Sequence, residues 1–372
     1  MMSRITDGSN SKQKGFTLIE LMIAMVLGLI LVAGVIQIFI SNKQAYRVTD
    51  AHSKLQDNAR FALEVLSRDV RSAGFSGCRA IEDMNVISIA DAPPPAVAPA
   101  TLAIPDENTV ISGLEAQTAT TWAPVSPPTP LGTVVGGTDV ITVQRGRSCG
   151  GNLIGNLGSS NANIQIIRPN ICNVQPDDVL MIADCTDAHI FRATNVSDGT
   201  GQQTIAHAAG NQANHFCKHY PSFPHNGVCN AGGAKLYDFD AELLVFSSAT
   251  YFIRLGTNGD PALWVYDNNE ATSANNPIEL IEGIEDMQIV YGLDTNDDDT
   301  VENYSDASVI DTAGNWNQVI SARISLLAQT QEQNLTTADQ SINFDGAPVA
   351  DTSDGRLRRV FTTTIGVRNR VQ

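Results

Sequence analysis

The sequence predicts an α+β protein in which one long N-terminal helix is packed on a mainly antiparallel β-sheet domain. Two observations lead to this fold class. No proline interrupts residues 16–73, whereas the later part of the 372-residue chain is a series of short β-branched runs. A third observation, the strongly apolar character of residues 16–40, predicts that the first part of the helix spans a membrane.

The chain begins with a polar, basic leader, residues 1–15, that ends at Gly15. Residues 16–40 follow as an apolar run of 25 residues in which Glu20 carries the only charge. As a helix this run is about 37 Å long, enough to cross a hydrocarbon core of about 30 Å. In a secretory signal peptide the small-residue cleavage site follows the apolar core, but here Gly15 precedes it. Cleavage at this glycine would leave the membrane helix on the mature chain.

The helix is predicted to continue as an amphipathic segment over residues 41–74. Apolar residues recur there at steps of three and four, and Gly74 is a plausible C-terminal stop. A continuous helix over residues 16–73 would be about 87 Å long. The apolar positions expected to face a globular domain are Leu55, Ala59, Ala62, Leu66 and Val70.

Residues 75–372 are predicted to form a β-rich globular domain outside the cytoplasm. A proline-rich insertion over about residues 92–130 is expected to be extended loop or linker, because consecutive prolines fit neither a helix interior nor a strand ladder. The predicted strands are residues 138–144, 163–168, 178–184, 189–196, 250–255, 262–266, 284–293, 319–330 and 358–369.

The junction Gly15-Phe16-Thr17-Leu18-Ile19-Glu20 resembles the class III signal of type IV pilins and of type II secretion pseudopilins. The resemblance implies cleavage between Gly15 and Phe16 by a prepilin peptidase, followed by N-methylation of Phe16. In a filament, Glu20 would face the protonated amine at Phe16 of a neighbouring subunit, since a buried charge is tolerated when another compensates it. The alternative is an interfacial acid that reaches the headgroups and has no specific role.

The C-terminal half resembles the PilW family of minor pilins, at residues 282–287, 290–294, 319–327 and 358–361 and around Trp316. This resemblance implies a low-abundance pilus subunit that helps to initiate assembly together with other minor pilins and the major pilin. It also implies a single-pass inner-membrane protein with a periplasmic C-terminal domain, which later enters the pilus. The alternatives are a minor pseudopilin of type II secretion, or a membrane-anchored periplasmic metal-binding or adhesion module.

Charge and motif content argue against two other classes of function. The formal net charge of −17 argues against a nucleic-acid-binding surface, which requires basic patches. No glycine-rich phosphate loop and no Gly-x-Ser-x-Gly motif is present. The sequence therefore predicts a protein that is not an enzyme.

An acidic run at residues 294–302 is the candidate metal site. Four aspartates and a glutamate in nine residues repel one another, and a hard divalent cation would relieve that repulsion. Asp299 stands where the calcium loop pattern has glycine, and Ser305 stands where it has its last glutamate. No cofactor is certain; calcium is one candidate, and a solvated acidic turn is the other. The alternating candidate ligands are Asp294, Asn296, Asp298, Thr300 and Glu302.

Six cysteines beyond the membrane segment predict disulfides, because an even count is typical of exported domains. Short loops favour Cys172–Cys185 and Cys217–Cys229, which leaves Cys78–Cys149. A zinc site formed by Cys217, Cys229 and the nearby His215, His219 and His225 is an alternative with poor ligand spacing.

The C-terminus of this acidic chain is basic. Its arginines would either bind an acidic neighbouring subunit or form ion pairs between strands. The arginines concerned are Arg356, Arg358, Arg359, Arg368 and Arg370.

Overall fold

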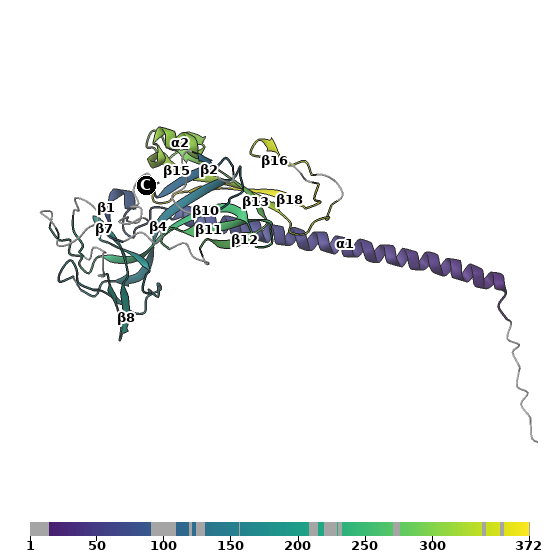
Figure 1. Ribbon diagram of the computed structural model, residues 1–372, viewed down its shortest axis with the longest axis horizontal. Helices are drawn as coiled ribbons and strands as arrows, with labels where there is room; N and C mark the ends of the chain where they lie inside the picture. Colours follow the sequence, from purple (N-terminus) through teal and green to yellow (C-terminus); the bar gives the residue numbers. More distant parts are fainter. Residues whose placement is uncertain are drawn as a thin grey trace, which may run out of the picture. The chain divides into compact units, whose positions relative to one another are not determined.

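The computed structural model confirms the predicted fold class: a long N-terminal helix and a mostly antiparallel β domain (Figure 1). The chain divides into two compact units, with the boundary between Ser53 and Lys54. The residues that the structure describes are 15–90, 109–118, 121–123, 131–155, 157–207, 215–218, 229, 233–270, 276–336, 340–349 and 353–371.

Helix α1 extends from Leu18 to Arg71, two residues shorter at each end than the sequence predicts. Its first part, which belongs to the N-terminal unit, has exposed apolar side chains from Leu18 to Ile40. By length and composition α1 can cross a membrane. Exposed leucine, isoleucine and valine side chains on every side of a helix are typical of a lipid-facing span.

The second part of α1 forms the central element of the globular unit. The predicted apolar stripe, from Leu55 to Val70, is buried in the largest hydrophobic core. Gly74 has a φ of +71°, a left-handed conformation that glycine adopts without steric cost. The predicted stop therefore lies three residues beyond the last helical residue.

The globular unit contains two main sheets among its described residues. All pairings in them are antiparallel except that of β1 with β7. The larger sheet is formed by β1 (Asn85–Ser88), β2 (Ile111–Ala116), β3 (Trp122–Ala123), β4 (Asp139–Asn152), β6 (Val179–Ala183), β7 (Asp187–Arg192), β10 (Glu242–Leu255), β11 (Pro261–Asp267) and β12 (Ile278–Glu282). The four-stranded sheet is formed by β14 (Asn303–Ser305), β13 (Ile284–Leu293), β15 (Val319–Gln329) and β18 (Arg358–Gly366).

Smaller elements complete the described fold. They are the sheet of β5 (Ile164–Ile167), β9 (Gln202–Ala206) and β8 (Asn195–Gly199), the hairpin of β16 (Asn343–Phe344) and β17 (Ala347–Pro348), helix α2 (Ala307–Ala313), and the 3-10 turns η1 (Ile81–Asp83) and η2 (Trp316–Gln318).

The described residues of the globular unit form three hydrophobic clusters, and the third, around Phe252 and Tyr266, is the smallest. The largest one joins α1 to both main sheets, with Leu66, Met181, Leu244 and Ile324 among its members. A second core lies beneath β5, β6 and β7 and is rich in aromatic side chains, including Phe191. Cys172, one of the disulfide-bonded cysteines, packs against this second core.

The three disulfides correct two of the predicted pairings. Cys217–Cys229 is confirmed, but the other two bonds are Cys78–Cys185 and Cys149–Cys172. The preference for short loops was wrong for Cys172 and Cys185 because strand β6 lies between them, and five residues of strand separate its ends by about 16 Å. Cys172 instead lies beside β4, where the neighbouring Ile171 N–H donates to the Cys149 carbonyl.

The proline-rich stretch predicted at 92–130 falls largely outside the described residues. Within its range, β2 and β3 pair with each other, and β2 also pairs with β4. The segment from Asp106 to Ala123 contains no proline, so it can contribute strands between the two proline-rich runs.

Candidate assembly and metal sites

The residues around the predicted cleavage point precede the helix. Gly15 and Phe16 have no regular secondary structure, and Phe16 is 88% exposed. The peptide bond between them therefore lies outside the helical hydrogen-bond ladder, in a form that a peptidase can reach.

Thr17 and Glu20 form a reciprocal cap at the start of α1. The Thr17 N–H and hydroxyl each donate to Glu20 Oε2 at 2.9 Å, and the Glu20 N–H donates to Thr17 Oγ1 at 3.3 Å. This is a capping box, in which side chains satisfy helix N–H groups that have no partner in the helix itself. Its signature, Thr-x-x-Glu, is present in the sequence at residues 17–20.

The cap fixes the position of the Glu20 carboxylate at the helix start. The carboxylate lies at the positive end of the helix dipole and one turn from Phe16. Thr17 holds one oxygen, Oε2, and none of the hydrogen bonds to Thr17 uses Oε1. A carboxylate in this arrangement is preorganised to accept an external cation such as an amino group.

The acidic loop between β13 and β14 brings three of the candidate calcium ligands together. One carboxylate oxygen from each of Asp294, Asp298 and Glu302 lies within 4.8 Å of the others. Asp294 is buried, whereas the other two are exposed. Thr300 donates its hydroxyl to Asp298, and the Asn296 amide donates to Asp298 Oδ2 at 3.2 Å.

The backbone of this loop wraps around the Asp294 carboxylate. Oδ1 accepts the N–H groups of Asn296 and Asp298 at 3.2 and 3.3 Å, and Oδ2 accepts that of Asp299 at 2.8 Å. A carboxylate has about four lone-pair positions, so one on Oδ2 remains for a cation. Asp299, at the position that the calcium loop pattern gives to glycine, has a φ of +63°. The loop thus adopts the turn that glycine would favour.

The donor atoms of these residues are of the type that a hard divalent cation binds. Oxygen donors from carboxylates, an amide and a backbone carbonyl are the ligands that Ca²⁺ prefers. Asp294, Asp298 and Glu302 would supply the charge, and Asn296 and Thr300 are placed in the same loop.

The alternative of a zinc site is wrong as far as its two cysteine ligands are concerned. Cys217 and Cys229 are bonded to each other, so neither can supply a thiolate to zinc. His215 Nδ1 lies 2.9 Å from the Ser160 hydroxyl. His219 and His225 lie outside the described residues.

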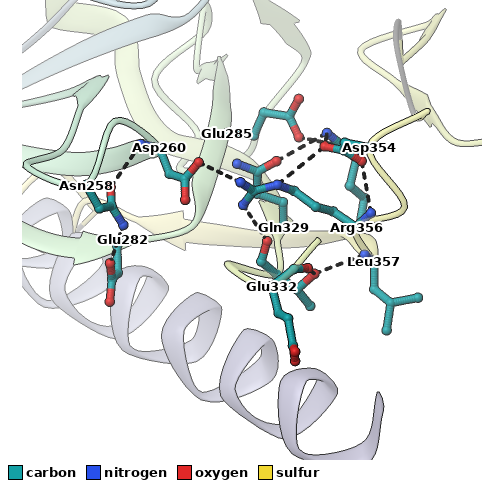
Figure 2. Close-up of polar contacts among 11 residues, drawn as sticks. Asn258, Asp260, Glu282, Glu285, Gln329, Glu332, Asp354, Arg356 and Leu357 are labelled. Atoms are coloured by element: carbon teal, nitrogen blue, oxygen red, sulfur yellow. Dashed lines mark hydrogen bonds and ion pairs between the residues drawn. The ribbon is translucent and has the colours of Figure 1, made fainter. Parts of the chain in front are cut away.

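Two of the C-terminal arginines form buried ion pairs, as Figure 2 shows for Arg356. Arg356 Nη2 lies 2.7 Å from Asp260 Oδ1, and Arg358 Nε lies 2.7 Å from Glu285 Oε2. Arg358 also binds both oxygens of Asp354 at 2.8 Å, and these bonds lower the pKa of Asp354. Because both guanidinium groups are nearly buried, they tie strand ends together rather than offering a basic docking surface.

Comparisons with known proteins agree with both resemblances. Residues 250–369 match the family model described as Type IV Pilus-assembly protein W, and residues 10–36 match the prokaryotic N-terminal methylation motif. A pilin-like protein of Thermus thermophilus, PilA3, is 36% identical over 62 residues, which are 17% of this chain and 27% of that protein. No solved structure matches. The matched families are pilus-assembly and pilin-type proteins rather than enzymes.

Proposed function

We propose that this chain is a minor pilin that helps to initiate type IV pilus assembly as part of a complex of low-abundance subunits. The observation that carries the proposal is the N-terminal arrangement: an accessible Gly15–Phe16 bond, followed by a capped helix that presents Glu20 one turn away. The match of residues 250–369 to the PilW family supports the pilus rather than another filament. The proposed partners are the prepilin peptidase, other minor pilins and the major pilin.

The proposed route starts in the inner membrane. The apolar first part of α1 holds the precursor there with its β domain in the periplasm, and cleavage before Phe16 creates the amine that a neighbouring Glu20 neutralises. Extraction of the subunit from lipid then becomes favourable only in the filament, where each buried charge meets its opposite. This assembly role requires no catalytic group in the β domain.

A gene deletion separates the pilus from the secretion alternative. Loss of a minor pilin that initiates assembly should reduce surface filaments recovered by shearing about tenfold or more while type II secretion continues, because initiation limits filament number. Immunoblots of sheared filaments and of secreted enzymes measure the two outcomes, with a plasmid copy of the gene as the control. If the deletion strain instead made normal filaments but lost secretion, the chain would be a pseudopilin of type II secretion and not a minor pilin.

We also propose that the acidic loop binds calcium through Asp294, Asp298 and Glu302, with Asn296 and Thr300 as further ligands. The convergence of three carboxylate oxygens within 4.8 Å supports this site. Binding to the folded state alone stabilises a protein by RT ln(1 + [L]/Kd), which is about 2.7 kcal/mol at a hundredfold excess over Kd.

Millimolar calcium should therefore raise the melting temperature of the full chain in detergent by several degrees relative to EDTA. The double variant Asp294→Ala with Asp298→Ala should lose this rise. The matched control is Asp57→Ala with Glu64→Ala, which removes two exposed carboxylates from α1 and should keep it. An unchanged wild-type melting temperature in calcium would leave the loop as a solvated acidic turn.

A further inference from the structure

The buried carboxylate of Asp139, at the start of β4, contacts one edge of strand β13. β13 pairs with β15 along its length, but with β14 only from Tyr291 to Leu293. On the part of this edge that no other described strand pairs with, the Ile289 N–H donates to Asp139 Oδ2 at 2.7 Å. Gln288 Nε2 donates to the Gly137 carbonyl at 2.6 Å beside it. The Asp139 side chain thus occupies the place of a neighbouring strand and joins the two main sheets.

The groups that face Asp139 are acidic. Glu115 lies directly opposite it in the β2–β4 ladder, Asp286 faces it from β13, and Asp306 faces it from the residue before α2. Glu115 is held in place by the Ser308 N–H of α2, which donates to Oε1 at 3.1 Å. Like charges opposite each other on a sheet are destabilising. The carboxylates therefore repel one another across the contact between the sheets.

A tyrosine hydroxyl increases the polarity of this contact without relieving the repulsion. Tyr291 is 1% exposed and faces Asp139 and Glu115, and its hydroxyl has no hydrogen-bond partner among the described residues. It lies over Gly113 of β2, where a Cβ would approach the hydroxyl oxygen to 2.3 Å. Because the backbone at Gly113 comes so close, the contact has little room to rearrange around a charge.

Burial raises the pKa of Asp139 to about 8, although the Ile289 hydrogen bond favours its ionised form. A carboxyl whose pKa is raised in the folded state binds a proton on folding. Its contribution to stability is complete below its unfolded pKa, falls as the pH rises, and is lost once the pH passes about 8. The proton also turns one oxygen of the Asp139 carboxyl group into an O–H donor.

We propose that the contact of Asp139 with β13 is a proton-sensitive joint between the two sheets, closed when Asp139 is protonated and loosened when it is ionised. The elements that depend on the joint are β13 and α2, because Ile289 of β13 donates to Asp139 and Ser308 of α2 donates to the facing Glu115. The joint lies between Asp139 of β4 and Ile289 of β13 and is separate from the ligands of the acidic loop. It gives the domain a response to alkaline conditions that is independent of the assembly function proposed above.

The pH range of the test follows from the other buried groups. Burial lowers the pKa of His189 to about 4, so its stabilising contribution is complete above its unfolded value of 6.5 and is lost only at lower pH. Burial raises the pKa of Asp286 to about 6, so its contribution is largely lost by pH 6.5. Between pH 6.5 and 8.5 Asp139 therefore has the largest effect of these three groups, and linkage predicts a change of about 30-fold in the equilibrium between closed and open joint.

Hydrogen–deuterium exchange of the full chain in detergent tests the joint. After correction for intrinsic exchange rates, peptides covering β13 and α2 should lose protection by about 30-fold from pH 6.5 to 8.5, while those from β8 and β9 remain unchanged. Asp139→Asn keeps an acceptor for the Ile289 N–H and cannot ionise, so it should be protected equally at both pH values. An unchanged wild type, or the same loss in Asp139→Asn, would overturn the proposal.

Glu115→Gln provides a second variant that does not alter Asp139 itself. Removing the facing charge lowers the cost of ionising Asp139, so the loss of protection over the same pH range should be smaller than in the wild type. If Glu115→Gln lost as much protection as the wild type, the proposed joint would be contradicted. This test remains decisive even if Asp139→Asn fails to fold.

Discussion

Glu20→Ala is expected to reduce recovery of this subunit in sheared filaments by about 100-fold, while leaving cleavage and membrane insertion intact. The reason is the amine of the neighbouring subunit, which would remain buried without a counter-charge. Removal of one partner from a buried ion pair costs about 3–5 kcal/mol, and each 1.4 kcal/mol is about tenfold in an equilibrium constant. Quantitative immunoblots of filaments, membranes and cleaved product measure the three quantities.

Two further variants separate the charge of Glu20 from its role in the helix cap. Glu20→Gln keeps a side chain that can complete the capping box with Thr17 but removes the charge, so it should be as defective as Glu20→Ala. Thr17→Ala removes the cap and keeps the charge, and a lost cap costs only about 1 kcal/mol. Normal incorporation of Glu20→Gln would show that the cap matters and the charge does not.

Asp69→Ala is expected to destabilise the globular unit by about 3–5 kcal/mol, because Asp69 anchors α1 to the larger sheet. Asp69 is 3% exposed. Its Oδ1 lies 2.8 Å from Arg145 Nη2 of β4, and its Oδ2 accepts the Tyr251 hydroxyl of β10 at 2.5 Å. The truncation would leave a nearly buried guanidinium and a buried hydroxyl without their shared acceptor. In detergent the melting temperature should fall by about 6–10 °C.

The matched control for this variant is Glu64→Ala on the same helix. Glu64 is exposed, so losing its carboxylate should change stability by less than about 0.5 kcal/mol. Asp69→Asn keeps an acceptor without the charge and should lie between the wild type and Asp69→Ala. A melting temperature of Asp69→Ala equal to that of Glu64→Ala would contradict the anchoring role.

The parts of the structure that sequence predicts well are those set by local periodicity. The stripe from Leu55 to Val70 follows the helical repeat, so both the helix and its buried face could be predicted. Helix α2 was missed because seven residues are too few for a periodic signal. Strand β2 was missed because it lies between two proline-rich runs, and its pairing with β4 is a long-range contact.

The candidate sites also differ in whether a local sequence pattern predicts them. The capping box is a local pattern that Thr17 and Glu20 show in the sequence, and the candidate ligands of the acidic loop were likewise chosen from a local alternation. The disulfides and the acidic joint depend on which strands become neighbours. Asp139 and Glu115 are distant in sequence and become a pair only through the β2–β4 register. No local sequence pattern around either residue predicts that contact.

Intact-mass and N-terminal analysis of the protein extracted from membranes tests the central claim most directly. Processing at the junction of leader and helix predicts a mature chain that begins at Phe16 and carries one methyl group on its amino nitrogen. A chain that retains the leader, or that begins at any other residue, would lack the amine that Glu20 is proposed to neutralise and would contradict the account.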